Sequence, residues 1–154
     1  MTKIQKVLLT GKTHTTASRR DGASRGGETS LDIQLSTPND RKLVHKFEAI
    51  QPHPTAEQLF AGAWSACYFT ALELVAKERK VQLPSDLAVD IEVDLGMTGD
   101  AYLLQARLNV SLPGVPEDVA QGLAHAADQI CPYSKATMGN IEVQLLVAQA
   151  APVD

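Results

Sequence analysis

The chain is poor in cysteine and in aromatic residues. Its 154 residues include two cysteines, one tryptophan and only 5% aromatic residues. Two cysteines cannot build the multiple-disulfide framework of a small secreted domain. In a reducing cytosol, a pair of thiols is instead catalytic, redox-sensing or buried as packing residues.

Positive charge and long apolar runs are also scarce. The formal net charge of −4 argues against nucleic acid as the main partner, because binding phosphates needs clustered basic side chains. We judge the apolar stretches to be far shorter than the ~20 residues that a bilayer-spanning helix needs. Segment 1–16 lacks the features of a signal peptide. We therefore expect a cytoplasmic protein with no membrane span.

The common motifs of metal and nucleotide sites are missing. The sequence has no CxxC, HExxH, GxGxxG, Walker A or GxSxG pattern. Its four histidines are scattered at positions 14, 45, 53 and 125, and His125 is expected on the surface of a helix. The sequence therefore predicts neither a metal site nor a bound cofactor.

The remaining composition is that of an ordinary globular domain, with 44% hydrophobic and 21% charged residues. We expect one domain over residues 1–154, of the α+β class, with segregated helices and antiparallel sheets. Alternating patterns predict strands at 3–13, 29–38, 87–96, 101–114 and 140–149, with a turn region at 18–28 and a polar connection at 39–55. Helices are predicted at 55–80 and 115–130.

The helix at 55–80 has the clearest pattern. Thr55 and Gln58 form a capping box, and Glu57 in the first turn complements the helix dipole. Helical spacing places seven residues on one apolar face: Phe60, Ala63, Trp64, Cys67, Ala71, Leu74 and Val75. The second helix, which Pro116 opens, has its apolar stripe at Val119, Leu123, Ala126 and Ile130.

Each cysteine has a structural and a chemical interpretation. Cys67, on the apolar face, is by itself most simply a packing residue, and a reactive Cys67 needs a cation that its own helix does not supply. Cys131 precedes Pro132, so the second helix should end there and a short helix with Pro132 first and Gly139 as its terminator should follow. That would place Cys131 at an N-cap, where its thiolate is favoured; a half-buried packing residue is the alternative.

Two segments resemble a known family. "AEQLFAGAWSACYFTAL" (56–72) and "CPYSKATMGNIEV" (131–143) are similar to the two signature segments of the OsmC/Ohr family, in the form of its organic hydroperoxide resistance (Ohr) branch. The flanking "RDG", "LDIQLSTP" and "VSLPG" occur in the same order, so the resemblance covers nearly the whole chain. It implies a thiol peroxidase for organic hydroperoxides, in an intertwined homodimer whose sheets wrap paired central helices.

The resemblance also implies roles for particular residues. Cys67 corresponds to the peroxidatic cysteine, Cys131 to the resolving cysteine that forms a disulfide with it, and Glu57 to the glutamate of the family motif. Arg20 is the chosen counterpart of the family's arginine, with Arg19 and Arg25 as substitutes. Arg20 would stabilise the Cys67 thiolate and Glu57 would hold its guanidinium. The implied reductant is a dithiol, such as a lipoyl-bearing protein.

Substrate preference follows from an apolar pocket that we assign to Phe60, Trp64 and Tyr68, which would favour bulky hydroperoxides over hydrogen peroxide. The sequence departs from the family pattern in its long, charged 39–55 connection and in "ATMGN" where "ATRGN" is frequent. Competing interpretations are an OsmC-branch peroxidase, a hydroperoxide sensor, and a non-catalytic dimeric binding module in which both cysteines are packing residues. A structural interaction protein has the least support, since no exposed repeat or charge block is present.

Overall fold

The computed structural model describes residues 3–16 and 55–148. Along the chain these residues form seven elements: β1 (Lys6–Thr16), α1 (Ala56–Glu78), β2 (Ala88–Thr98), β3 (Ala101–Ser111), α2 (Glu117–Ile130), α3 (Pro132–Thr137) and β4 (Glu142–Ala148). The strands predicted at 3–13, 87–96, 101–114 and 140–149 and both predicted helices are confirmed, with shifted ends. The strand predicted at 29–38, the turn region at 18–28 and nearly all of the 39–55 connection lie outside the described residues.

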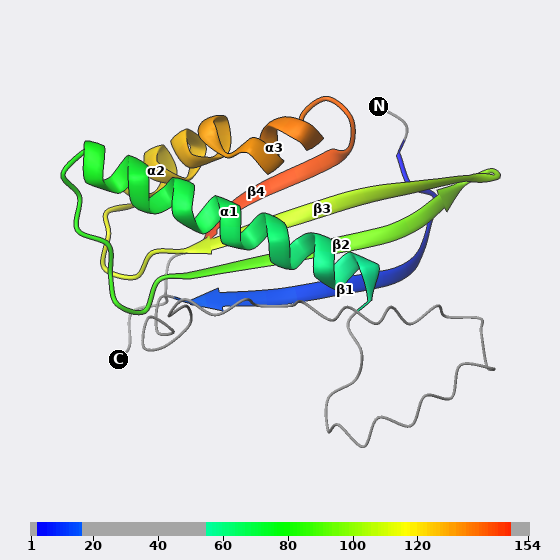
Figure 1. The fold of residues 1–154 in the computed structure, drawn as a ribbon, viewed down its shortest axis with the longest axis horizontal. Coiled ribbons are helices and arrows are strands. Elements are labelled where there is room, and N and C mark those ends of the chain that lie inside the picture. The colour runs from blue at the N-terminus through cyan, green and yellow to red at the C-terminus, as the bar shows by residue number, and fades with distance from the viewer. Residues whose placement is uncertain (1–2, 17–54, 149–154) are drawn as a thin grey trace, which may run out of the picture.

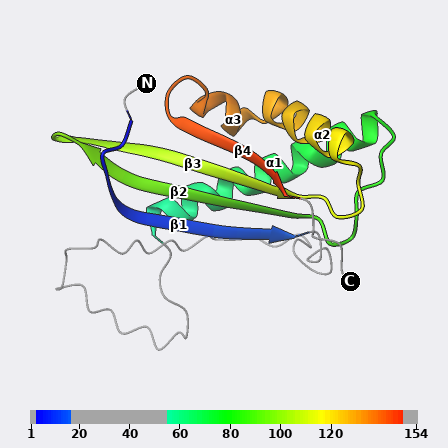
Figure 2. The same cartoon turned by 180° about the vertical axis from the view of Figure 1, so that it is seen from behind.

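The four described strands form one sheet in the order β1-β2-β3-β4, with the helices on one of its faces (Figures 1 and 2). The first three strands are antiparallel, as predicted, but β4 pairs with β3 in parallel. The prediction of purely antiparallel sheets is therefore wrong. The physical reason is the connection: α2 and α3 carry the chain back over the sheet, so β4 starts from the same end as β3.

The β2–β3 hairpin turns within the segment "MTGD" (97–100). Thr98 pairs with Ala101, which leaves a two-residue loop of Gly99 and Asp100. Gly99 has φ of +58°, a left-handed conformation that glycine adopts without steric cost. The local turn chemistry therefore fixes the register of β2 and β3.

Helix α1 begins at the predicted capping box. The Thr55 side chain accepts from the Gln58 backbone N–H at 3.2 Å, and Gln58 Oε1 accepts from the Thr55 N–H at 3.0 Å. Beneath this first turn β1 passes very closely, because a Cβ added at Gly11 would lie 2.6 Å from the Gln58 nitrogen. Glycine at position 11 therefore allows the start of α1 to rest on the sheet.

The apolar residues of α1 are divided between two faces. Trp64, Ala71 and Val75 are buried in the core, whereas Phe60 and Leu74 are 36% and 51% exposed. The prediction of one apolar face is therefore wrong. The second face, at spacings of three and four residues, consists of Phe60, Ala63, Cys67, Thr70 and Leu74, and we call it the open face of α1.

This second apolar face also affects the membrane prediction. By length and composition α1 is apolar enough to cross a bilayer, contrary to the expectation that no stretch is. The core helix of a soluble protein can have the same length and apolar composition. Half of the most apolar stretch of α1 is buried inside the protein. Helix α1 packs on β1, β2 and α2, which is the position of a core helix.

Helices α2 and α3 are separated by a sharp break at Cys131. Cys131 has φ −63° and ψ 120°, the extended conformation that a following proline favours, and Pro132 takes the first position of α3. Gly139, with φ of +74°, follows the end of α3 as predicted. Pro116 is the N-cap of α2 rather than its first residue, and His125 is exposed.

Candidate functional site

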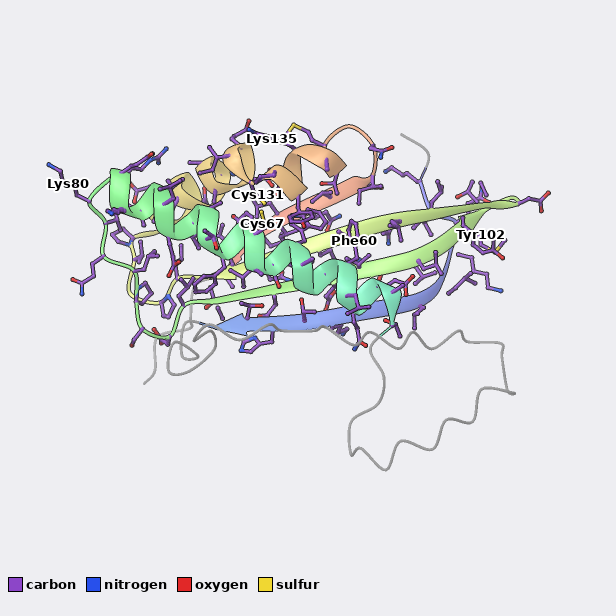
Figure 3. All side chains as sticks on the ribbon, in the orientation of Figure 1. Phe60, Cys67, Lys80, Tyr102, Cys131 and Lys135 are labelled. Atoms are coloured by element: carbon purple, nitrogen blue, oxygen red, sulfur yellow. The ribbon has the colours of Figure 1, made fainter. Side chains whose placement is uncertain are left out.

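The two cysteines meet where α1 and α3 touch. Cys67 lies midway along α1 and Cys131 at the N-cap of α3, and their Sγ atoms are 3.5 Å apart (Figure 3). Both are free thiols. Cys131 is completely buried, which corrects the half-buried alternative, whereas Cys67 keeps part of its surface accessible. A reagent can therefore reach Cys67 more easily than its neighbour.

The backbone holds Cys131 from both sides. Its N–H donates to the Ala127 carbonyl at 2.9 Å, as the last bond of α2, and its carbonyl accepts from the Lys135 N–H at 3.0 Å, as the first bond of α3. Its side chain makes no capping hydrogen bond to α3. The thiol is therefore directed toward Cys67 rather than used as a helix cap.

The surroundings of Cys67 determine its ionisation. Burial raises the pKa of its thiol above the ordinary value, and the contact with Cys131 raises it further. A hydrogen bond from the Tyr133 backbone N–H lowers the pKa in part. None of these contributions from described residues comes from a cation. A thiolate at neutral pH therefore needs a positive charge from elsewhere.

The three residues assigned to a substrate pocket lie at different depths. Trp64 and Tyr68 are fully buried, and Phe60 lies on the open face of α1. The Phe60 and Trp64 rings meet edge to face with centroids 5.8 Å apart, so Trp64 supports Phe60 from behind. Desolvation raises the pKa of the Tyr68 phenol, which keeps it neutral.

Both buried aromatic residues use their polar atoms to bind neighbouring helices. Trp64 Nε1 donates to Ser134 Oγ at 3.0 Å, and the Tyr68 hydroxyl donates to the Ala124 carbonyl at 2.7 Å. Sequence reasoning did not identify Ser134, although its place three residues after Cys131 on the same short helix was a usable signal.

Glu57 and Cys67 lie apart on the same helix. Ten residues separate them, which corresponds to about 15 Å along the helix axis at 1.5 Å per residue. Glu57 therefore cannot contact the Cys67 thiol of its own chain. Arg20, Arg19 and Arg25 lie outside the described residues.

A separate hollow of about 190 Å³ lies between the α2–α3 segment and β4. Its lining consists of Asp128, Ser134, Thr137, Met138, Gly139, Ile141, Val143 and Leu145. Neither cysteine lines it, so it is distinct from the thiol pair. Within residues 3–16 and 55–148, no group of three or more His, Cys, Asp or Glu side chains is arranged to hold a metal ion.

Comparison with known proteins agrees on one family. A family model described as OsmC-like protein matches residues 46–146. The organic hydroperoxide resistance protein of Xanthomonas axonopodis pv. citri is 35% identical over 149 residues, covering 96% of this chain and 100% of that protein. The organic hydroperoxide resistance protein OhrB of Bacillus subtilis is 33% identical over 139 residues, covering 90% and 97% of the two chains.

One solved structure aligns with nearly the full length of the chain. The crystal structure of an organic hydroperoxide resistance protein from Elizabethkingia anophelis is 29% identical and superposes with a TM-score of 0.64, covering 96% of this chain and 100% of that one. The described α+β arrangement of a mixed four-stranded sheet and helices therefore matches solved structures of this type.

Proposed function

The chain belongs to the OsmC-like family, in its organic hydroperoxide resistance branch, and on that premise we propose that it is a cysteine-based peroxidase that reduces organic hydroperoxides, including those of fatty acids, to alcohols. The observation that carries the proposal is the 3.5 Å approach of Cys67 and Cys131. A pair of free thiols at this distance, with one partly accessible, suits a cycle that passes through a disulfide.

The proposed reaction has three steps. The Cys67 thiolate attacks the distal oxygen of ROOH, the O–O bond breaks, and the alkoxide takes a proton and leaves as ROH, so that Cys67 becomes a sulfenic acid. Cys131 then attacks the Cys67 sulfur as a thiolate; the S–S bond forms and hydroxide leaves, protonated to water. A dithiol, for which a lipoyl-bearing protein is our proposal, reduces the disulfide and is itself oxidised.

The geometry favours the second step. A disulfide has an S–S length of about 2.05 Å, so the two sulfur atoms need to approach by roughly 1.5 Å from their present separation. We propose that side-chain rotation and a small adjustment of the helices supply this movement, so that the disulfide closes without rearrangement of the fold.

We assign the missing cation to Arg20, with Arg19 and Arg25 as its substitutes. Because burial raises the pKa of the Cys67 thiol, a guanidinium beside the sulfur would restore the thiolate at neutral pH. Glu57 would orient the guanidinium through a bidentate ion pair. Since Glu57 lies about 15 Å along the helix from Cys67 of its own chain, Glu57 of the partner subunit fits this role better.

A homodimer that pairs the open faces of two α1 helices satisfies that requirement. If the helices run antiparallel about a two-fold axis near Gly62 and Ala63, the first turn of one helix comes beside Cys67 of the other. The small, exposed side chain of Ala63 at the crossing allows the backbones to approach closely. Such pairing would cover the exposed Phe60 and Ala63, and it supports the proposal of an intertwined dimer with its sites at the subunit interface.

Phe60, Trp64 and Tyr68 remain our assignment for the substrate pocket. Phe60 is placed for direct contact with an apolar substrate, and Trp64 and Tyr68 support the wall from the core. The single-domain organisation over residues 1–154 is also part of the proposal, supported by relatives that match 96% of the chain. A cytoplasmic location suits a cycle whose dithiol must be reduced again after each turnover.

The test uses the reduced protein and one equivalent of cumene hydroperoxide. We expect intact-mass analysis to show the loss of two hydrogens, and peptide mapping to show Cys67 linked to Cys131. Linoleic acid hydroperoxide should react much faster than hydrogen peroxide, and equal rates would contradict the apolar pocket. Two thiols that stay free would overturn the peroxidase assignment.

The complete burial of Cys131 is the observation that favours the binding module as a second candidate, because inert buried cysteines are common. Cys67→Ser separates the two functions. A peroxidase loses all turnover in this variant, whereas a binding module keeps its affinity for an apolar ligand.

A further inference from the structure

The short helix α3 begins directly after Cys131 and has few hydrogen bonds to the rest of the fold. It contains six residues, and its hydrogen bonds at either end join it to neighbouring turns of its own chain segment. Among the described residues, and apart from the bonds to the Cys67 sulfur, one side-chain hydrogen bond connects α3 to another element. That bond joins Trp64 Nε1 of α1 to Ser134 Oγ.

The Trp64–Ser134 bond joins the same two segments as the thiol pair. Trp64 precedes Cys67 by three residues and Ser134 follows Cys131 by three, so each partner lies about one helical turn from a thiol. Both side chains are buried, with Trp64 fully covered and Ser134 3% exposed. In such an environment the donor and the acceptor have no water to replace a lost partner.

We propose that this hydrogen bond positions Cys131 for the disulfide-forming step and so protects Cys67 from irreversible oxidation; the inference rests on the peroxidase function proposed above. Ser134 and Trp64 act here as positioning residues. The bond fixes the distance and rotation of α3 relative to α1, and therefore the direction in which the Cys131 thiol approaches Cys67.

The protection is a competition between two reactions of the Cys67 sulfenic acid. In one, the Cys131 thiolate attacks the sulfur, the disulfide forms, and hydroxide leaves to become water. In the other, a second ROOH transfers oxygen to the sulfur, ROH leaves, and Cys67 becomes a sulfinic acid. The second rate rises with hydroperoxide concentration, whereas the first is intramolecular and does not depend on that concentration.

Ser134→Ala removes the acceptor and leaves the Trp64 N–H buried without a partner. We expect α3 to shift, the disulfide step to slow and the first oxidation of Cys67 to keep its rate constant. In single-turnover reactions without reductant, intact mass reports the fractions of disulfide and sulfinic acid. The hydroperoxide concentration that gives equal amounts of both should fall roughly five- to tenfold, as for the loss of one net hydrogen bond.

Two further variants separate positioning from general stability. Thr137→Val removes a buried hydrogen bond within α3, from Thr137 Oγ1 to the Ser134 carbonyl at 2.9 Å. This variant should keep the wild-type partition, by which we mean the ratio of disulfide to sulfinic acid at a given hydroperoxide concentration. The double variant Trp64→Phe/Ser134→Ala removes donor and acceptor together, which leaves no unpaired N–H. Its thermal stability should recover while its partition stays shifted toward sulfinic acid.

The outcomes are distinct. A wild-type partition in Ser134→Ala, a shift of equal size in Thr137→Val, or recovery of the wild-type partition in the double variant would each overturn the positioning role. If wild-type protein itself forms no disulfide, the peroxidase function fails and not only this inference. The rate constant of disulfide formation, measured for each variant with one equivalent of hydroperoxide, separates a slower disulfide step from faster overoxidation.

Discussion

The Sγ atoms of Cys67 and Cys131 lie 3.5 Å apart although 64 positions separate the two residues in the chain. The contact depends on three features: the packing of α1 against α2 and α3, the helix break at Pro132, and the absence of a capping role for the Cys131 thiol. Because the folded chain holds the thiols together, the proposed disulfide-forming reaction would be intramolecular and have a high effective concentration.

Removing the resolving thiol should stop the cycle after its first step. In Cys131→Ser, Cys67 still reduces one hydroperoxide, but its sulfenic acid has no thiol to condense with. We expect one equivalent of alcohol per chain, trapping of Cys67 by dimedone, and sulfinic acid when hydroperoxide is in excess. Sustained turnover of Cys131→Ser with a dithiol, at the wild-type rate, would contradict the role given to Cys131.

The pH dependence of Cys67 should reveal the cation. Burial raises the pKa of the Cys67 thiol, so the thiolate fraction at pH 7 falls unless a positive charge opposes that effect. Arg20→Ala should therefore move the midpoint of Cys67 alkylation by iodoacetamide to higher pH, and lower the rate at pH 7. The experiment uses Cys131→Ser as background so that one thiol reacts.

Arg25→Ala is the matched control for that experiment, because it removes an arginine from the same segment of the sequence. Its alkylation midpoint should equal that of the parent protein. An unchanged midpoint in Arg20→Ala, together with a shifted one in Arg25→Ala, would transfer the role to Arg25.

Local signals in the sequence predicted the local structure well. Thr55 and Gln58 identified the start of α1, and Pro132 identified the helix break at which the buried Cys131 thiol points toward Cys67. These features depend on residues close together in the chain, where capping and proline sterics act regardless of the rest of the fold. The approach of the two thiols came from the family resemblance, since no local pattern specifies a contact across 64 positions.

Tertiary packing decided the features that sequence reasoning missed. Helical periodicity does not show that α1 has two apolar faces, one for the core and one that is open, because both faces consist of the same residue types. Alternation in 140–149 identified β4 but not its parallel pairing, which the α2–α3 connection determines. Arg20 lies outside the described residues, so its assignment stays a prediction.

The sheet face opposite the helices carries a charge network centred on Asp94. Arg107 donates to both Asp94 oxygens, at 2.8 and 3.0 Å, while Thr10 and Gln105 each donate at 2.6 Å. These bonds, above all those from Arg107, hold the pKa of Asp94 well below its usual range. Asp94→Asn should therefore lower the free energy of unfolding at pH 7 by about 2 kcal/mol.

The pH dependence of the stability lost in Asp94→Asn follows from the lowered pKa of the Asp94 carboxyl. A depressed carboxyl pKa stabilises the fold at pH values above the unfolded pKa of about 4, and this stabilisation is lost as the pH falls toward the folded pKa. Urea unfolding should show the full effect of Asp94→Asn at pH 7 and a smaller one at pH 3. Asp100→Asn, in the exposed hairpin turn, should be neutral at both; an equal loss at pH 3 and pH 7 for Asp94→Asn would rule out the ion pair as its cause.

Replacing Lys80 should stabilise the protein. Helix α1 ends in a Schellman motif, with bonds from Val81 N–H to the Ala76 carbonyl and from Lys80 N–H to the Lys77 carbonyl. Lys80 has φ of +56°, where a side chain is strained by about 1 kcal/mol relative to glycine. Lys80→Gly should raise the free energy of unfolding by up to this amount, whereas Lys77→Gly, inside the helix, should lower it. A decrease in both variants would show that the left-handed position is not strained.

The open face of α1 should control dimerisation. Ala63 is exposed on this face beside the proposed two-fold axis, and Ala101 is exposed at the start of β3 in the β2–β3 hairpin. Ala63→Lys places a charge in the proposed helix–helix interface, so we expect the dimer to dissociate at concentrations where the wild type is dimeric, as measured by sedimentation velocity. Ala101→Lys has the same change of side chain at another exposed position and should leave the dimer intact. Because the proposed site needs Glu57 of the partner subunit, the Ala63→Lys monomer should also lose peroxidase activity while keeping the near-wild-type circular dichroism of a folded chain. Dissociation by Ala101→Lys and not by Ala63→Lys would place the interface at the hairpin end of the sheet.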